Sequence, residues 1–287
     1  MKSLREYTKE AEEKKVAIGH FNISNLEGFW AVVNTVKKLG VPAIIGVSEG
    51  ERDFVGIKQV KALVDTAKQE NLPVFLNADH SYSVDRVKEV IDAGFDAAII
   101  DGAEKSFEEN LKITKESVEY KNQANPNALV EAELGFIGKS SKILDEIPEG
   151  AGWSDQMMTK PEEALEFVGE TGIDLFAPAV GNIHGMVKSG HNPKLNIERI
   201  RQIKEAVKIP LVLHGGSGIS DEDFKKAIEA GISIIHINTE IRLAYKQGLQ
   251  RSLSENPDEI APYKYLRPAL QEMQLAIEKR LALFNNL

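Results

Sequence analysis

The chain has 287 residues, of which 42% are hydrophobic, and its formal net charge is -9 at pH 7. This length suits a single α/β-barrel domain spanning residues 1–287. The acidic balance argues against nucleic acid as a partner, because phosphate backbones require clustered lysine and arginine. The absence of cysteine excludes disulfides and thiolate metal ligands, so any bound metal must take His, Asp or Glu. No signal peptide or membrane span is recognisable, so we expect a cytoplasmic protein without membrane contact.

Eight short apolar runs alternate with amphipathic helical stretches along the chain. Several of these runs are rich in Val, Ile and Leu without a polar face, which is typical of parallel strands covered by helices. They span residues 16–22, 43–48, 74–79, 97–101, 128–134, 175–180, 211–214 and 233–238. Eight β/α units in this order predict the α/β fold known as a TIM (β/α)8 barrel.

Helix starts and the tail of the chain fit this alternation. Ser24-Asn25-Leu26-Glu27 and Ser220-Asp221-Glu222-Asp223 follow capping-box-like patterns just after the first and seventh predicted strands. Residues 139–161 form the longest insertion and are numerous enough for a mobile lid. The tail after Ser254 predicts an additional C-terminal helix ending near Phe284, which either covers the barrel or docks against another subunit.

Polar side chains gather at the ends of the predicted strands, where the active face of a TIM barrel lies. Seven of the eight strand exits carry at least one of them, and His184 follows the sixth strand at a short distance. The residues at the exits are Asn22, Ser48, Asp79 with His80, Asp101, Glu131 with Glu133, His214, and Asn238 with Thr239.

His80, His184 and His214 together predict a zinc site. Neutral imidazole is the commonest zinc ligand, and three protein ligands leave a fourth position for a substrate oxygen. Asp79, beside the first ligand, is the candidate acid/base, although a helix-capping role is an alternative. The backbone amides of Gly215-Gly216-Ser217-Gly218 are positioned to cradle a phosphate, unless this segment is only a tight turn.

Seven motifs, in order along nearly the whole chain, resemble those of the class II aldolases. They are Gly19-His20-Phe21-Asn22, Val47-Ser48-Glu49-Gly50, Ala78-Asp79-His80, Ile100-Asp101-Gly102, Glu131-Ala132-Glu133-Leu134-Gly135, Gly181-Asn182-Ile183-His184-Gly185 and His214-Gly215-Gly216-Ser217-Gly218. The resemblance implies a zinc-dependent enzyme that cleaves a ketose 1,6-bisphosphate, chiefly fructose or tagatose bisphosphate. The products would be dihydroxyacetone phosphate and glyceraldehyde 3-phosphate, and the enzyme would be a homodimer or homotetramer.

The resemblance also implies roles for individual residues. His80, His184 and His214 would bind one zinc ion, and Asp79 would take the C4 hydroxyl proton. A monovalent cation near the phosphate is a further expectation. The implied substrate contacts are Gly185, Lys188, Gly215, Ser217 and Thr239 at the C1 phosphate, Asn22 and Ser48 near the aldehyde end, Asn238 at the C4 hydroxyl, and Arg242 at the distal phosphate. Asp101 and Glu133 are candidates for holding a metal-binding histidine or for binding metal in an alternative position, and Glu131 shares the strand face of Glu133. A simple ion pair is the alternative for Glu131 and Glu133.

Two histidines depart from the family pattern. His236 stands where the family usually has Asn, and His20 stands where a small residue is common. The two positions lie on the first and eighth predicted strands, which are neighbours in a closed barrel, and each comes two residues before an active-face Asn. We expect the two side chains to touch, directly or through water, as a local replacement for the missing Asn; the alternative is that His236 only fills the same volume.

The lid and the last strand also depart from the pattern. Lys139-Ser140-Ser141-Lys142 replaces the acidic pair that is common in the family, so Asp145 or Glu146 is the candidate for protonating the enediolate. The position that reads C4 stereochemistry is Asn238, which fits neither the fructose-bisphosphate nor the tagatose-bisphosphate pattern. Arg242 resembles the fructose-bisphosphate form, and that substrate is favoured over tagatose bisphosphate.

Other functional classes explain these residues less well. A zinc hydrolase would not need two phosphate-binding elements beside the metal. A Schiff-base aldolase would need an inward lysine on a strand, and none of the eight runs contains one. A catalytically silent sugar-phosphate sensor on the same scaffold is the remaining alternative, because of His236 and the missing lid acid.

Overall fold

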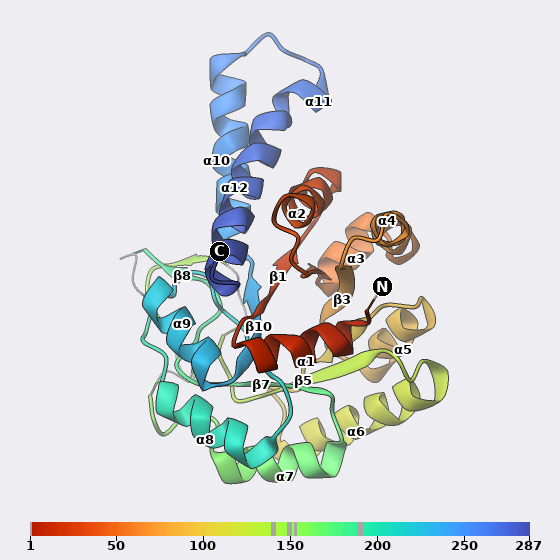
Figure 1. Cartoon of the computed structure of the whole chain (residues 1–287), viewed down its shortest axis with the longest axis vertical. Coiled ribbons are helices and arrows are strands. Elements are labelled where there is room, and N and C mark those ends of the chain that lie inside the picture. Colours follow the sequence, from red (N-terminus) through yellow and green to blue (C-terminus); the bar gives the residue numbers. More distant parts are fainter. Residues whose placement is uncertain (1, 139–141, 148–150, 152–153, 189–191) are drawn as a thin grey trace.

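The structure of the chain is a computed structural model that describes residues 2–138, 142–147, 151, 154–188 and 192–287. Within these residues, eight parallel strands close into a barrel in the order β1-β10-β9-β7-β5-β4-β3-β2 (Figure 1). The barrel strands are β1 (Ile18–Asn22), β2 (Ala43–Val47), β3 (Val74–Ser81), β4 (Ala97–Ile100), β5 (Leu129–Leu134), β7 (Leu175–Pro178), β9 (Leu211–Leu213) and β10 (Ile232–Ile237). Each overlaps one predicted strand, and the TIM-barrel prediction is confirmed.

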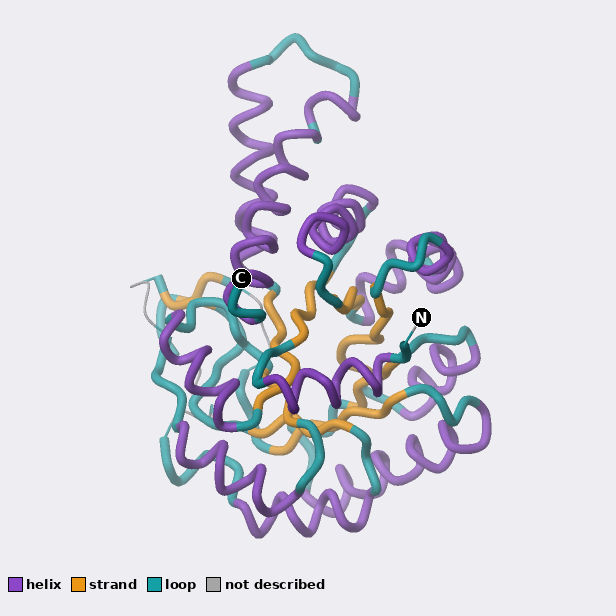
Figure 2. Tube along the Cα trace, in the orientation of Figure 1, coloured by secondary structure: helices purple, strands orange, loops and turns teal. Residues whose placement is uncertain are grey.

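Helices surround the barrel, as the tube in Figure 2 shows. They are α1 (Leu4–Lys14), α2 (Leu26–Leu39), α3 (Glu49–Val55), α4 (Ile57–Gln69), α5 (Val84–Asp92), α6 (Phe107–Ala124), α7 (Pro161–Thr171), α8 (Ile197–Val207), α9 (Asp221–Ala230), α10 (Thr239–Glu255), α11 (Pro262–Tyr265) and α12 (Arg267–Phe284). The Asn25 side chain caps α2 and the Ser220 side chain caps α9, so both predicted helix starts are confirmed. No helix among the described residues has the length and apolarity needed to cross a membrane.

The barrel interior is layered, because alternate residues of each strand point inward. The lowest layer is an apolar cluster that α1 closes with Leu4 and Ala11. Its strand residues are Ile18, Ile44, Phe75, Ala97, Leu129, Leu175, Val212 and Ile234. Two and four residues further along the strands stand polar side chains such as His20 and Asn22, or Glu131 and Glu133. The apolar layer therefore seals the barrel beneath a polar upper half.

The insertion before α7, which was predicted to be long enough for a mobile lid, contains a short strand. Residues of this segment form a short strand, β6 (Ile143–Leu144), which pairs in parallel with β8 (Met186–Val187) in the loop after His184. Two residues carry too little periodicity to reveal such a strand in the sequence, because the pairing depends on a tertiary neighbour. Residues 139–141, 148–150 and 152–153 of the predicted lid lie outside the described residues, as does His191.

The predicted C-terminal helix is present as α12, which packs beside α10 and α2 and extends with α10 away from the barrel (Figure 1). Its inner end is fixed by Arg280, whose side chain is 8% exposed and forms ion pairs with Glu240 of α10 and Asp221 of α9. The guanidinium donates to Glu240 over 2.7 Å through Nε and to Asp221 over 2.7 Å through Nη1. One buried cation thus joins three helices.

Replacing Arg280 with alanine should lower the free energy of unfolding by about 3 kcal/mol, because Glu240 would lose its partner in a mostly buried site. Arg251→Ala, which removes a half-exposed ion pair with Glu272 on the same helix pair, should cost less than about 1 kcal/mol. Urea unfolding of both variants measures the difference. Equal losses in the two variants would show that the buried cluster adds nothing beyond a surface pair.

Candidate metal centre and substrate cavity

The first metal-ligand candidate, His80, stands in an irregular part of β3. The pairing of β3 with β4 shifts register between Ala78 and Ser81, and His80 has a φ of 45°, which lies in the left-handed region. The strand continues two residues beyond its predicted end, through this shift. Such a conformation is costly for a residue with a Cβ and is typical of functional sites. The buried Arg52 holds it in place by donating to the Asp79 carbonyl over 3.2 Å and to Ser81 Oγ over 3.1 Å.

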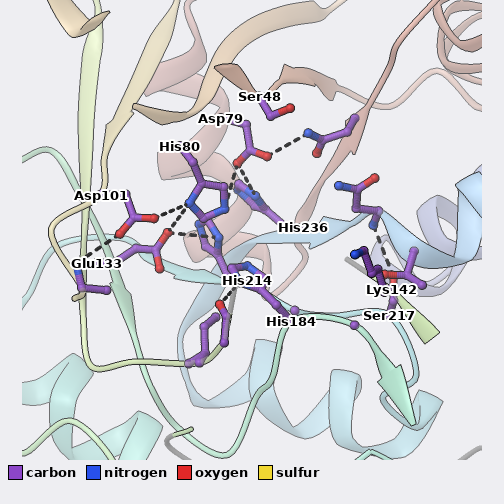
Figure 3. A pocket seen from close by; sticks show the side chains of 18 of the residues that line it. Ser48, Asp79, His80, Asp101, Glu133, Lys142, His184, His214, Ser217 and His236 are labelled. Atoms are coloured by element: carbon purple, nitrogen blue, oxygen red, sulfur yellow. Dashed lines mark hydrogen bonds and ion pairs between the residues drawn. The ribbon is translucent and has the colours of Figure 1, made fainter. Parts of the chain in front are cut away.

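The imidazoles of His80, His184 and His214 converge at the top of the barrel (Figure 3). The ring centroid of His80 lies 5.1 Å from that of His184 and 5.2 Å from that of His214. The His80 ring is steeply inclined to both of the other rings. One nitrogen from each ring lies within 4.8 Å of the others. The three predicted ligands therefore come together, although β3, β7 and β9 lead to them from separate parts of the chain.

Each of these imidazoles is anchored through one nitrogen. His80 Nδ1 lies 2.9 Å from Asp101 Oδ2, His184 Nδ1 lies 2.7 Å from the Gly138 carbonyl, and His214 Nε2 lies 2.6 Å from Glu131 Oε1. All three partners are oxygen acceptors, so in each case the anchored nitrogen carries the hydrogen. In the neutral rings, the opposite nitrogens keep their lone pairs; they are Nε2 of His80, Nε2 of His184 and Nδ1 of His214.

The donor set fits a divalent metal ion. Nδ1 of His214 is buried and has no hydrogen-bond partner among the described residues, although Glu133 Oε1 lies 3.5 Å away. Unpartnered buried nitrogens of this kind are costly in a folded protein and are typical of a ligand site. Glu133 Oε1 also lies 3.0 Å from His80 Nδ1, so Asp101 and Glu133 both contact the first histidine.

Asp79 lies beside the imidazole cluster and is almost fully buried. Its Oδ2 accepts a hydrogen bond of 2.8 Å from the amide of Asn22, and its Oδ1 lies 3.6 Å from His236 Nδ1. Oδ1 has no hydrogen bond within the described part of the chain. This carboxylate is therefore held on one side and open to a further proton donor on the other.

The loop after β9 forms the other side of the site. Gly215 has a φ of 62°, and a Cβ there would lie 2.2 Å from the Ile183 carbonyl, so only glycine fits. Ser217 Oγ accepts hydrogen bonds from the backbone N–H groups of Asn238 and Glu240, which leaves its hydroxyl proton free to donate. Asn192 joins this loop to the preceding one, because its amide donates to the carbonyls of Gly185 and Ser217. The loop after β9 thus lies at the N-terminus of α10, where backbone N–H groups favour the binding of an anion.

A cavity of about 660 Å³ connects these groups. Its lining includes the predicted site residues Asn22, Ser48, Asp79, His80, Asp101, Glu133, His184, Gly185, His214, Gly215, Ser217, His236, Asn238, Thr239 and Arg242. Lys188 is not among the lining residues; its exposed ammonium group pairs with Asp145 instead. Asp145 and Glu146 do not line the cavity either, and their role in protonating an enediolate stays a prediction.

Known proteins match this chain over its whole length. The model of the family described as "Fructose-bisphosphate aldolase class-II" matches residues 2–287. The chain belongs to this family. It is 36% identical to a fructose-bisphosphate aldolase of Geobacillus stearothermophilus, with 99% of this chain and 96% of the relative covered. It is 35% identical to a fructose-bisphosphate aldolase of Staphylococcus epidermidis, with 98% and 96% covered.

Solved structures agree with this assignment. The YdjI aldolase from Escherichia coli K12 superposes with a TM-score of 0.80 at 30% identity, covering 99% of this chain and 97% of that one. A putative fructose-1,6-biphosphate aldolase from Coccidioides immitis superposes with a TM-score of 0.84 at 28% identity, covering 98% and 96%. Class II aldolases depend on a metal, and this chain has the His, Asp and Glu groups to bind one.

The buried groups of this aldolase site shift one another's pKa. Burial favours the neutral form of His80, but the Asp79 and Glu133 carboxylates outweigh burial and raise its pKa well above the ordinary value. Burial alone would raise the pKa of Glu133, yet His214 and His80 lower it to about 2. Burial raises the pKa of Glu131 despite its bond to His214. The carboxylates therefore compensate for positive charge at the top of the barrel.

His20 and His236 are in direct contact, as predicted. Their backbones are partners in the pairing of β1 with β10, and their rings stack in parallel at 3.5 Å between centroids. His236 also stacks on His214 at 3.9 Å, so this column of rings reaches the metal-ligand candidates. Gly46 makes room for it, because a Cβ there would lie 2.1 Å from the His20 ring. Whether the pair replaces the family Asn in function stays a prediction.

Sequence reasoning missed Glu51 and left the role of Glu131 open between an ion pair and a contact with the metal site. The bond of Glu131 to His214 depends on the arrangement of strands that are distant in sequence. Glu51 is 7% exposed and accepts hydrogen bonds from Asn22 and Ser48, two predicted substrate contacts. The spacing Ser48-x-x-Glu51 is a visible capping-box signal, but it does not reveal the contact with Asn22.

The pKa of His20 is lowered from 6.5 to about 4 by burial. The unfolded chain therefore binds more protons at this residue between these values, and stability falls as the pH falls. When the pH is lowered from about 7 to about 5, the free energy of unfolding of His20→Phe should fall by about 2 kcal/mol less than that of the native chain. Urea unfolding in a chelating buffer at both pH values measures this. An identical pH dependence in the two proteins would show that His20 is not buried in the neutral form.

Proposed function

We propose that this chain is a zinc-dependent aldolase that reversibly cleaves fructose 1,6-bisphosphate into dihydroxyacetone phosphate and glyceraldehyde 3-phosphate. One observation carries the proposal: each imidazole of His80, His184 and His214 is anchored through one nitrogen, and the three rings each place a nitrogen within 4.8 Å of the others. The names of the similar aldolases support the substrate. Zinc is the ion proposed, because three imidazole donors with an open fourth position are typical of catalytic zinc.

The residues of the chain divide the chemistry among them. The metal, held by the three histidines, would supply Lewis-acid polarisation of the substrate carbonyl. Asp79 would take the C4 hydroxyl proton as the C3–C4 bond breaks, because its carboxylate is fixed by Asn22 and has an open oxygen. Asp101 and Glu131 would keep the ligand imidazoles in the required tautomer.

The phosphate groups would be held away from the metal. Gly185, Gly215, Ser217 and Thr239 line the cavity around the N-terminus of α10 and would bind the C1 phosphate through hydroxyl and backbone donors. Asn22 and Ser48, at the ends of β1 and β2, also line the cavity and would contact the aldehyde end, and Asn238 would contact the C4 hydroxyl. Lys188 would have to leave Asp145 to reach the phosphate, and a monovalent cation there stays a prediction.

Removal of the metal should abolish cleavage of fructose 1,6-bisphosphate, and added Zn²⁺ should restore it, because the metal would supply the Lewis-acid polarisation of the substrate carbonyl. The measurement is the coupled detection of triose phosphates before and after chelation, with the zinc content determined in parallel. Tagatose 1,6-bisphosphate tested in the same assay decides between the two substrates. Full activity after complete loss of metal would refute the proposal, and binding without turnover by the zinc-loaded protein would favour the silent sensor.

Asp79→Asn should lower kcat by about a hundredfold or more, because an amide cannot accept the hydroxyl proton. Zinc content should stay unchanged, since the three histidines remain. Asp92→Asn, which alters a surface carboxylate bonded to Tyr120, should leave kcat unaffected. A kcat within a few-fold of the native value in the zinc-loaded Asp79→Asn variant would exclude Asp79 as the base.

We also propose a homodimer or homotetramer. The end of the α10–α12 pair that points away from the barrel exposes apolar side chains, including Leu253, Ile260 and Tyr263. Exposed apolar groups gathered on one projection favour self-association.

A further inference from the structure

A buried carboxylate, Glu51, lies on the aldehyde side of the cavity. It is the third residue of α3, where it forms a capping box with Ser48, and its exposed fraction is 7%. Its Oε2 accepts hydrogen bonds from Asn22 Nδ2 at 2.9 Å, from Ser48 N at 2.8 Å and from Ser48 Oγ at 2.9 Å. Its Oε1 accepts one from Ser24 Oγ at 3.0 Å and one from the guanidinium of Arg242. Glu51 thus engages each residue that was assigned to this end of the substrate.

These bonds use up the donors that a phosphate would need. The Asn22 amide has two N–H groups, of which one goes to Glu51 and the other to Asp79 Oδ2. The single hydroxyl proton of Ser48 also goes to Glu51. Asn22 and Ser48 therefore offer oxygen lone pairs to a substrate, and lone pairs accept hydrogen bonds from hydroxyl groups rather than donate to phosphate oxygens.

The charge on this side of the cavity is also balanced. The positive charge of Arg242 is paired with the negative charge of Glu51, and Glu49 lines the same region. The other cations among the described lining residues are Lys105 and Lys142, which follow β4 and β5. In the barrel order, β5 is opposite β1, and the Lys142 carbonyl accepts a hydrogen bond of 2.9 Å from the Met186 N–H, next to Gly185 in the loop assigned to the C1 phosphate. A phosphate dianion on the aldehyde side would therefore meet little uncompensated positive charge.

A purely structural role accounts for only part of this network. Glu51 and Ser48 form a capping box at the start of α3, which explains the two bonds from Ser48. It does not explain the bonds from Asn22 on β1 or from Arg242 on α10, a residue 191 positions away in sequence. These contacts join Glu51 to the substrate cavity rather than to its own helix.

We propose that Glu51 is a specificity-determining residue that adapts the aldehyde half of the site to an uncharged, hydroxyl-bearing chain. The favoured substrates would be ketose 1-phosphates whose aldehyde product carries no phosphate, with ketose bisphosphates cleaved less efficiently. The inference rests on the proposed aldolase function. Glu51 does not touch the reacting atoms; it acts through Asn22, Ser48 and Arg242, whose donors and charge it occupies.

The test compares kcat/KM for fructose 1-phosphate and fructose 1,6-bisphosphate, with dihydroxyacetone phosphate as the common product detected. The native zinc-loaded enzyme should favour fructose 1-phosphate. In Glu51→Gln, which keeps a capping-box residue but removes the charge, the ratio should shift toward the bisphosphate by about tenfold or more, mainly through KM. Asp53→Asn is the matched control, because it removes one charge from the same helix at a side chain that is 65% exposed and pairs with Arg86.

Each outcome decides the proposal. A native enzyme that favours the bisphosphate strongly, or a ratio that Glu51→Gln leaves unchanged, overturns the role of Glu51 while the aldolase function stands. An equal shift in Asp53→Asn assigns the effect to overall charge and overturns it as well. If the zinc-loaded native enzyme releases dihydroxyacetone phosphate from neither compound, the proposed function fails, and the inference fails with it.

Discussion

One anchored nitrogen on each imidazole is the constraint on which this site depends. An imidazole has two nitrogens, and only the one without hydrogen can bind a metal. Asp101, Glu131 and the Gly138 carbonyl each accept a hydrogen bond from a ring, which fixes the tautomer and directs the other nitrogen inward. Without these acceptors the same histidines would remain at the strand ends, but their lone pairs would have no common direction.

Burying the carboxylates around these histidines costs free energy, which the barrel has to offset. A carboxylate inside a protein is stable only if it is paired or hydrogen-bonded. Glu131, Glu133 and Asp79 are nearly inaccessible to solvent, and each lies against one or more histidines. A bound cation would compensate the same charges more fully. The polar upper half of the barrel is therefore a balanced cluster, held above an apolar layer that excludes water from below.

The two ends of the cavity differ in the donors that they present. At the N-terminus of α10, Ser217 keeps a free hydroxyl proton, and positive backbone dipoles face the cavity. On the β1 and β2 side, Glu51 takes up the protons of Asn22 and Ser48. One end is thus suited to an anion and the other to hydroxyl groups. The asymmetry follows from a single buried carboxylate at the start of α3.

The sequence by itself determined the barrel, because apolar runs alternating with capped helices leave few other ways to bury parallel strands. It also determined that His80, His184, His214 and Asp79 lie on one face of the barrel, since polar residues at strand ends share one face of any TIM barrel. Only the tertiary structure decided which atoms meet. The partners of the histidines, the pairing of Lys188 with Asp145, and the donors that Glu51 occupies all depend on side-chain directions between segments far apart in the chain. Periodicity carries no information on such directions, because it fixes the face on which a residue lies and not the atom that it contacts.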